Sequence, residues 1–134
     1  MVVDFLNKKF KLASSDKFDE YMKATGVGLI TRKVGANVSP VMELEKDEAT
    51  GEYTLHSNST FKNHAIKFKL GEEFDEDTPD GRKVKSVITV DGNTMHHVQK
   101  GDKETIIERV FSADEVKMTL KVDDIVCTRI YKPL

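Results

Sequence analysis

From Val41 to the end of the chain, apolar and polar residues alternate with a period of two, in short runs separated by turn-forming residues. Met42 and Leu44 alternate with glutamates, and Ile66 and Phe68 alternate with lysines. A period of two is typical of β-strands, because successive side chains point to opposite faces of a sheet. The chain is therefore predicted to consist mostly of strands.

The strand-like runs lie near Phe10 and at residues 41–45, 53–55, 66–70, 84–90, 95–99, 105–111, 115–122 and 125–132. Turn residues separate them, and Asp91-Gly92 is a strong hairpin signal. About ten short strands joined by tight turns predict an all-β fold, either an antiparallel sandwich or a barrel.

Helical spacing interrupts this pattern between the first strand and the others. Phe18, Tyr21 and Met22 recur as on one face of a helix, Ser14–Asp16 offer N-cap oxygens upstream, and Gly26 suits the C-cap. We predict a first helix here.

A second short helix is predicted from Gly28 to about Val34, and Gly35, Asn37 and Pro40 are expected to stop it. Because the helix pair follows one strand and precedes all the others, it is interpreted as a cap on the sheet.

Composition narrows the class of protein. A chain of 134 residues fits one domain spanning residues 1–134, and its net charge of −2 gives no reason to expect a nucleic-acid partner. One cysteine, Cys127, allows no internal disulfide, and no signal-peptide or membrane-span pattern is present. We expect a cytosolic monomer.

Two strands carry arginines on the apolar phase. Arg109 shares its phase with Ile107 and Phe111, while the glutamates of that strand take the other phase. On the last strand, Arg129 and Tyr131 fall on the phase opposite Lys132. Both arginines are therefore predicted to point inward.

Burying a charged group costs free energy, and arginine cannot avoid this cost by losing its proton, so we expect an anion to bind each buried guanidinium. Neither strand has an inward acidic residue, which predicts a lumen with no acid of its own and a guest that brings a carboxylate. Two alternatives stay open: the arginines pair with an acidic residue or internal water, or a β-bulge shifts the phase.

Several segments carry a resemblance to a known family. They read FKLASSDKFDEYMKATGVGLITRK from residue 10, STFKN from residue 59, FKLGEEFDE from residue 68, DGRKVKS from residue 80 and CTRIYK from residue 127. In this order and spacing, along nearly the whole chain, the sequence resembles the intracellular lipid-binding proteins, specifically the fatty-acid-binding proteins.

The resemblance implies a ten-stranded β-barrel, flattened like a clam, with a two-helix lid between the first two strands and a cavity for one long-chain fatty acid. It implies a carboxylate site at Arg109, Arg129 and Tyr131, and cavity or portal positions at Phe18, Tyr21, Met22, Pro40, Phe61 and Asp80. A retinoic-acid carrier on the same fold is the alternative, because that ligand is also a carboxylate.

An enzyme is the contrasting class. No nucleophile-elbow, phosphate-loop or zinc spacing is present, and His96 and His97 are predicted to face opposite sides of a strand. We expect no catalytic residues, no metal and no cofactor.

Basic residues near the predicted entrance of the cavity raise the hypothesis of brief contact with anionic membranes. They are Lys17, Lys23, Arg32, Lys33 and Lys62. The alternative, that these residues form an ordinary solvated surface, is slightly favoured.

Overall fold

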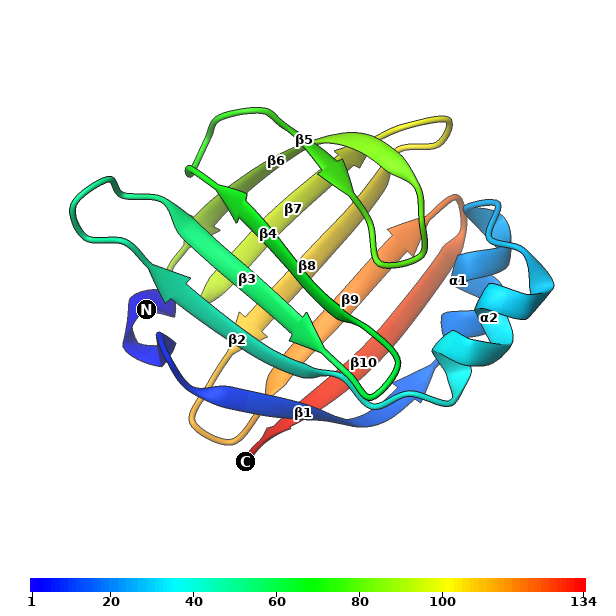
Figure 1. Ribbon diagram of the computed structural model, residues 1–134, viewed down its shortest axis with the longest axis horizontal. Coiled ribbons are helices and arrows are strands. Elements are labelled where there is room, and N and C mark those ends of the chain that lie inside the picture. The colour runs from blue at the N-terminus through cyan, green and yellow to red at the C-terminus, as the bar shows by residue number, and fades with distance from the viewer.

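The computed structural model describes residues 1–134 and consists of ten strands, two α-helices and one 3-10 turn (Figure 1). The elements are η1 (Val2–Phe5), β1 (Lys9–Asp16), α1 (Phe18–Ala24), α2 (Leu29–Ala36), β2 (Val41–Lys46), β3 (Tyr53–Asn58), β4 (Asn63–Phe68), β5 (Phe74–Asp77), β6 (Lys83–Asp91), β7 (Thr94–Lys100), β8 (Thr105–Phe111), β9 (Val116–Val122) and β10 (Ile125–Pro133).

All ten strands belong to one antiparallel sheet in the order β4-β3-β2-β1-β10-β9-β8-β7-β6-β5. Every neighbour in this order is also a neighbour in the chain except β1 and β10, whose pairing joins the two halves. The sheet therefore curls into a nearly closed barrel, with β4 and β5 at its two free edges (Figure 1). The predicted barrel with a two-helix lid between its first two strands is confirmed.

Alternation predicts nine of the ten strands but not β5. This strand has only four residues, and its buried inward side chain is Glu76, which a hydrophobic pattern does not pick out. Its exposed neighbours Asp75 and Asp77 make the whole segment look like an acidic loop.

The helix boundaries differ from the prediction at two places. Ser14–Asp16 do not cap α1; they continue β1 and pair with β10, so their backbone belongs to the sheet. The N-cap is Lys17, in a left-handed conformation with no side-chain cap hydrogen bond. Gly35 does not stop α2 but lies inside it. A glycine fits this position because the helix packs closely against α1, where a Cβ at residue 35 would lie 3.2 Å from the sulfur of Met22.

Two groups of buried apolar side chains stabilise the barrel. One fills the end opposite the helices, where Phe111 packs against Phe5 and Phe10 at ring-centroid distances of 6.0 and 6.3 Å. The other lies under the lid, where Tyr21 and Met22 of α1 join apolar residues of β8, β9 and β10. Between these groups the barrel is left hollow. Neither helix has the length and apolar content that a membrane span would need.

Candidate functional site

A cavity of about 380 Å³ lies inside the barrel beneath the helices. Its wall brings together all nine residues proposed from the sequence: Phe18, Tyr21, Met22, Pro40, Phe61, Asp80, Arg109, Arg129 and Tyr131. They come from six separate parts of the chain, and the closure of the barrel places them around one space. Their roles toward a ligand remain a prediction.

Arg109 and Arg129 lie in one cross-strand row. Each pairs with Met118 of β9, from β8 on one side and β10 on the other, so their backbones stand roughly 10 Å apart. Tyr131 follows Arg129 by two residues and therefore faces the same side. The exposed fractions of the two arginines are only 7% and 4%, which confirms the inward phase that alternation predicted.

Neither guanidinium touches a carboxylate. The Nε atoms of both arginines are buried without a hydrogen-bond partner. The guanidinium of Arg129 lies over the ring of Phe18, 3.7 Å from its centroid, and so touches the lid helix. Arg109 makes one hydrogen bond, in which Nη1 donates to Nδ1 of His97 over 3.3 Å. Burial lowers the pKa of Arg109 below its usual range.

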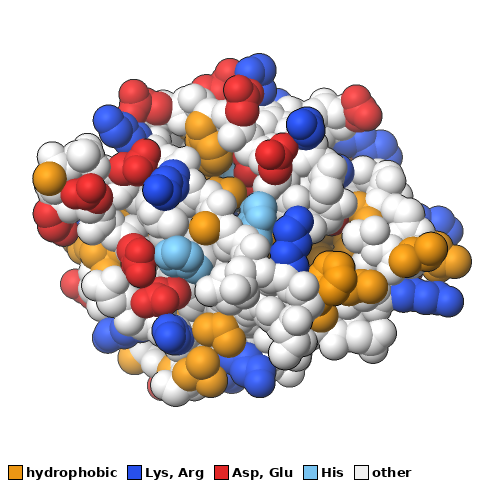
Figure 2. Space-filling view, viewed as in Figure 1, with side chains coloured by type: hydrophobic (Ala, Val, Ile, Leu, Met, Phe, Trp, Pro, Cys, Tyr) orange, Lys and Arg blue, Asp and Glu red, His pale blue; other side chains and the backbone are white.

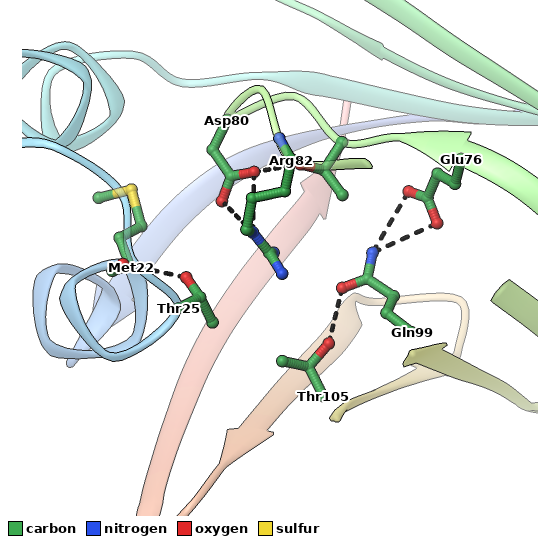
Figure 3. A network of polar contacts seen from close by, with 8 residues as sticks. Met22, Thr25, Glu76, Asp80, Arg82, Gln99 and Thr105 are labelled. Carbon is green, nitrogen blue, oxygen red and sulfur yellow. Dashed lines mark hydrogen bonds and ion pairs between the residues drawn. The ribbon is translucent and has the colours of Figure 1, made fainter. Parts of the chain in front are cut away.

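The expectation of a lumen with no acid is wrong. Glu76 of β5 is 4% exposed and accepts hydrogen bonds from Ser86 Oγ (2.7 Å), His97 Nε2 (2.7 Å) and Gln99 Nε2 (3.3 Å to each carboxylate oxygen). Thr105 in turn donates to Gln99, as Figure 3 shows. One local feature of the sequence could have indicated that Glu76 points inward: Glu76 shares a strand phase with Phe74, opposite the exposed Asp75.

His97 links this acid to the arginine pair. Because Arg109 has only donors to offer, Nδ1 of His97 accepts, and the imidazole proton sits on Nε2 toward Glu76. Burial and the neighbouring Arg109 lower the pKa of His97. Burial alone would raise the pKa of Glu76, but the hydrogen bond from His97, the charge of its imidazole once that is protonated in acid, and the hydrogen bonds of Ser86 and Gln99 lower it to about 2. The hydrogen-bonded series Glu76, His97 and Arg109 therefore has a neutral histidine in the middle.

This arrangement predicts acid sensitivity. A histidine whose pKa is lowered on folding stabilises the protein above pH 6.5, and that stability is lost as the pH falls from 6.5 toward the folded pKa. The loss attributable to His97 is about 1.4 kcal/mol per pH unit in that window. We expect His97→Gln to reduce the slope of the free energy of unfolding against pH just below pH 6.5, measured by urea titration, while His64, whose pKa burial also lowers, keeps its own share of the slope.

The matched control is His96→Gln, which makes the same substitution on the half-buried opposite face of β7 and should change the slope less than His97→Gln does. Equal slopes in wild type and His97→Gln would contradict a neutral buried His97. Glu76 acts in a lower window: its depressed pKa contributes stability above pH 4.5 that is lost between about pH 4.5 and 2.

The opening of the cavity lies between the lid and two turns. Phe61, in the β3–β4 turn, is 64% exposed, and Ile30 of α2 is 82% exposed. Figure 2 shows hydrophobic side chains gathered at this end of the molecule. In the β5–β6 turn, Asp80 accepts hydrogen bonds from Thr78 and from Nε of Arg82, the latter at 3.2 Å (Figure 3). This turn therefore carries a charge pair of its own at the rim.

The basic residues considered for membrane contact are not all free. Arg32 forms an ion pair with Asp19 at 3.1 Å and donates to the carbonyl of Val27. The four lysines of that set are exposed.

Comparison with known proteins adds the family. Residues 8–133 match the model of the lipocalin / cytosolic fatty-acid binding protein family. The chain is 54% identical over 133 residues to the muscle fatty acid-binding protein of Schistocerca gregaria, and the match covers 98% of each chain.

Solved structures of fatty acid-binding proteins are also similar to this chain. A fatty acid-binding protein from brain tissue of Drosophila melanogaster superposes with a TM-score of 0.90 at 53% identity, covering 96% of this chain and 98% of that one. A Schistosoma mansoni fatty acid binding protein in complex with arachidonic acid superposes with a TM-score of 0.93 at 38% identity, covering 99% and 98%. The family match over residues 8–133 and the identity to these relatives show that the chain belongs to the lipocalin / cytosolic fatty-acid binding protein family.

Proposed function

We propose that this protein is a carrier that holds one long-chain fatty acid in the barrel, with the carboxylate bound by Arg109, Arg129 and Tyr131. The observation that carries the proposal is the pair of buried arginines on the wall of a largely apolar cavity, neither of which contacts an acidic side chain. A buried unpaired guanidinium costs several kcal/mol, and a ligand carboxylate that accepts its hydrogen bonds offsets that cost.

The names of the relatives support the same ligand class. The Schistocerca protein is named a fatty acid-binding protein, and the Schistosoma protein was solved with arachidonic acid, which is a long-chain fatty acid. Their similarity to this chain extends over nearly its full length.

The tail and the head group of the ligand would contribute differently to binding in this cavity. Burying a methylene group gains roughly 0.8 kcal/mol, so a C16 tail offers on the order of 12 kcal/mol before ordering costs. The tail would therefore supply most of the affinity. The arginines and the phenol would orient the ligand and disfavour neutral lipids, because an alcohol or ester satisfies their donors poorly.

The surroundings of the reactive side chains also favour a carrier over an enzyme. Cys127 is fully buried, and burial raises its pKa to about 11, which makes it a poor nucleophile. His97, the most buried histidine, is engaged on both ring nitrogens. Neither side chain is poised to attack a bound lipid.

The proposal is tested by native extraction of the protein followed by mass spectrometry of the bound lipid. We expect one fatty acid per chain, and a delipidated sample should bind oleate with a 1:1 stoichiometry and prefer it to retinoic acid. Recovery of a neutral lipid, or tighter binding of retinoic acid than of oleate, would refute the proposal.

A further inference from the structure

The lumen holds an unequal number of buried charges. Three charged side chains on its wall are buried: Arg109 and Arg129 are positive, and Glu76 is negative. Two positive charges and one negative charge leave a surplus of one positive charge. His97, which lies between Arg109 and Glu76, adds none while its imidazole is neutral.

The remaining charged residues on the wall do not change this balance. Asp80 and Arg82 form an ion pair at the rim and cancel each other. Lys62 also borders the cavity but is exposed to solvent, where water and salt screen its charge. The surplus seen by a buried head group is therefore set by Arg109, Arg129 and Glu76.

Glu76 is held in its charged form by geometry. Ser86, His97 and Gln99 direct hydrogen-bond donors at its carboxylate from β6 and β7, and the side chain is almost completely buried. It cannot swing away to solvent without breaking all of these bonds. Its negative charge is a permanent part of the wall, joined to Arg109 through His97.

We infer that Glu76 is a specificity-determining residue: by balancing one of the two lumen arginines, it makes the cavity accept head groups with a single negative charge, such as a carboxylate, and reject doubly charged ones, such as a phosphate monoester. The inference rests on the proposed function. In a low-dielectric interior an uncompensated charge is costly, so the second negative charge of a dianion would have no partner in this lumen.

The test compares palmitate with hexadecyl phosphate, two ligands with the same tail and different head charges. At pH 8 the phosphate carries close to two negative charges, because its second pKa is about 6. Affinities are measured by displacement of a fluorescent probe. Wild type should prefer palmitate, and Glu76→Gln should shift the ratio of the two dissociation constants toward the phosphate by about tenfold or more, since the lumen then holds two surplus positive charges.

Two further variants separate this effect from general ones. Asp75→Asn removes the same charge from the adjacent position of β5, where the side chain is exposed and paired with Lys85, and should keep the wild-type ratio. Glu76→Asp keeps the charge inside and should also keep a preference for palmitate. A ratio in Glu76→Gln within twofold of wild type, or an equal shift in Asp75→Asn, would overturn the inference.

The wild-type protein offers a second measurement that does not depend on the folding of any variant. Between pH 8 and pH 6 about half of the hexadecyl phosphate becomes a monoanion, while the carboxyl of palmitate stays ionised, so the affinity of the phosphate relative to palmitate should rise. Three histidines lie on or next to the cavity wall, His56, His64 and His97, and palmitate, which is exposed to the same side chains, serves as the reference. An unchanged ratio across this range would overturn the inference. Failure of wild type to bind palmitate at all would instead refute the proposed function.

Discussion

Replacing Arg129 with glutamine is expected to weaken oleate binding by about 10- to 100-fold and to raise the stability of the ligand-free protein. The loss of affinity corresponds to the roughly 1.5–3 kcal/mol that a hydrogen bond between charged groups contributes in a buried site. The gain in stability has a different cause. Arg129 is 4% exposed, has an unpartnered Nε and contacts no acid, so its removal relieves a buried charge.

This prediction is checked by calorimetric titration with oleate and by thermal unfolding without ligand. The matched control is Lys132→Gln, which removes a positive charge from the outer face of the same strand, where the side chain pairs with Glu115. That variant should leave oleate affinity unchanged. Wild-type affinity in Arg129→Gln would remove Arg129 from the site, and a large drop in its stability would show that the charge is already compensated.

Replacing Phe111 with alanine should produce the opposite pattern, a loss of about 3–5 kcal/mol in the free energy of unfolding with little change in oleate affinity. Phe111 is 2% exposed and packs on Phe5 and Phe10 at the closed end of the barrel. It does not line the cavity. Removing its ring leaves a void that the surrounding strands can fill only partly.

Urea unfolding measures the first effect, and titration of the folded variant with oleate measures the second. Val110→Ala, on the exposed face of the same strand, is the control and should change the free energy of unfolding by less than about 0.5 kcal/mol. A loss below 1 kcal/mol in Phe111→Ala would contradict the packing described here. A tenfold weaker oleate affinity would show that the closed-end core and the cavity are coupled.

Much of the barrel follows from local pattern. A strand places every second side chain on one face, so alternation alone puts Arg109 and Arg129 inside. The same rule separates His97, which is buried, from the half-buried His96. These predictions succeed because each strand is long enough for its phase to be counted.

The remainder depends on pairings between distant segments. Glu76, Ser86, His97 and Arg109 come from four different strands, and no single stretch of sequence indicates that they meet. The strand carrying Glu76 is too short to show a phase, which is why an acid inside the lumen was missed. The role of Gly35 is equally non-local, because it depends on the position of Met22 on the other helix.

The most direct test of the proposed site is a crystal structure of the protein with bound oleate. We predict that the carboxylate oxygens lie within hydrogen-bond distance of the Arg129 guanidinium and the Tyr131 hydroxyl, on the side of the cavity that Arg109 faces, with the tail running toward Phe61. A carboxylate at the rim beside Lys62, with the methyl end of the tail against the arginines, would contradict the proposed site.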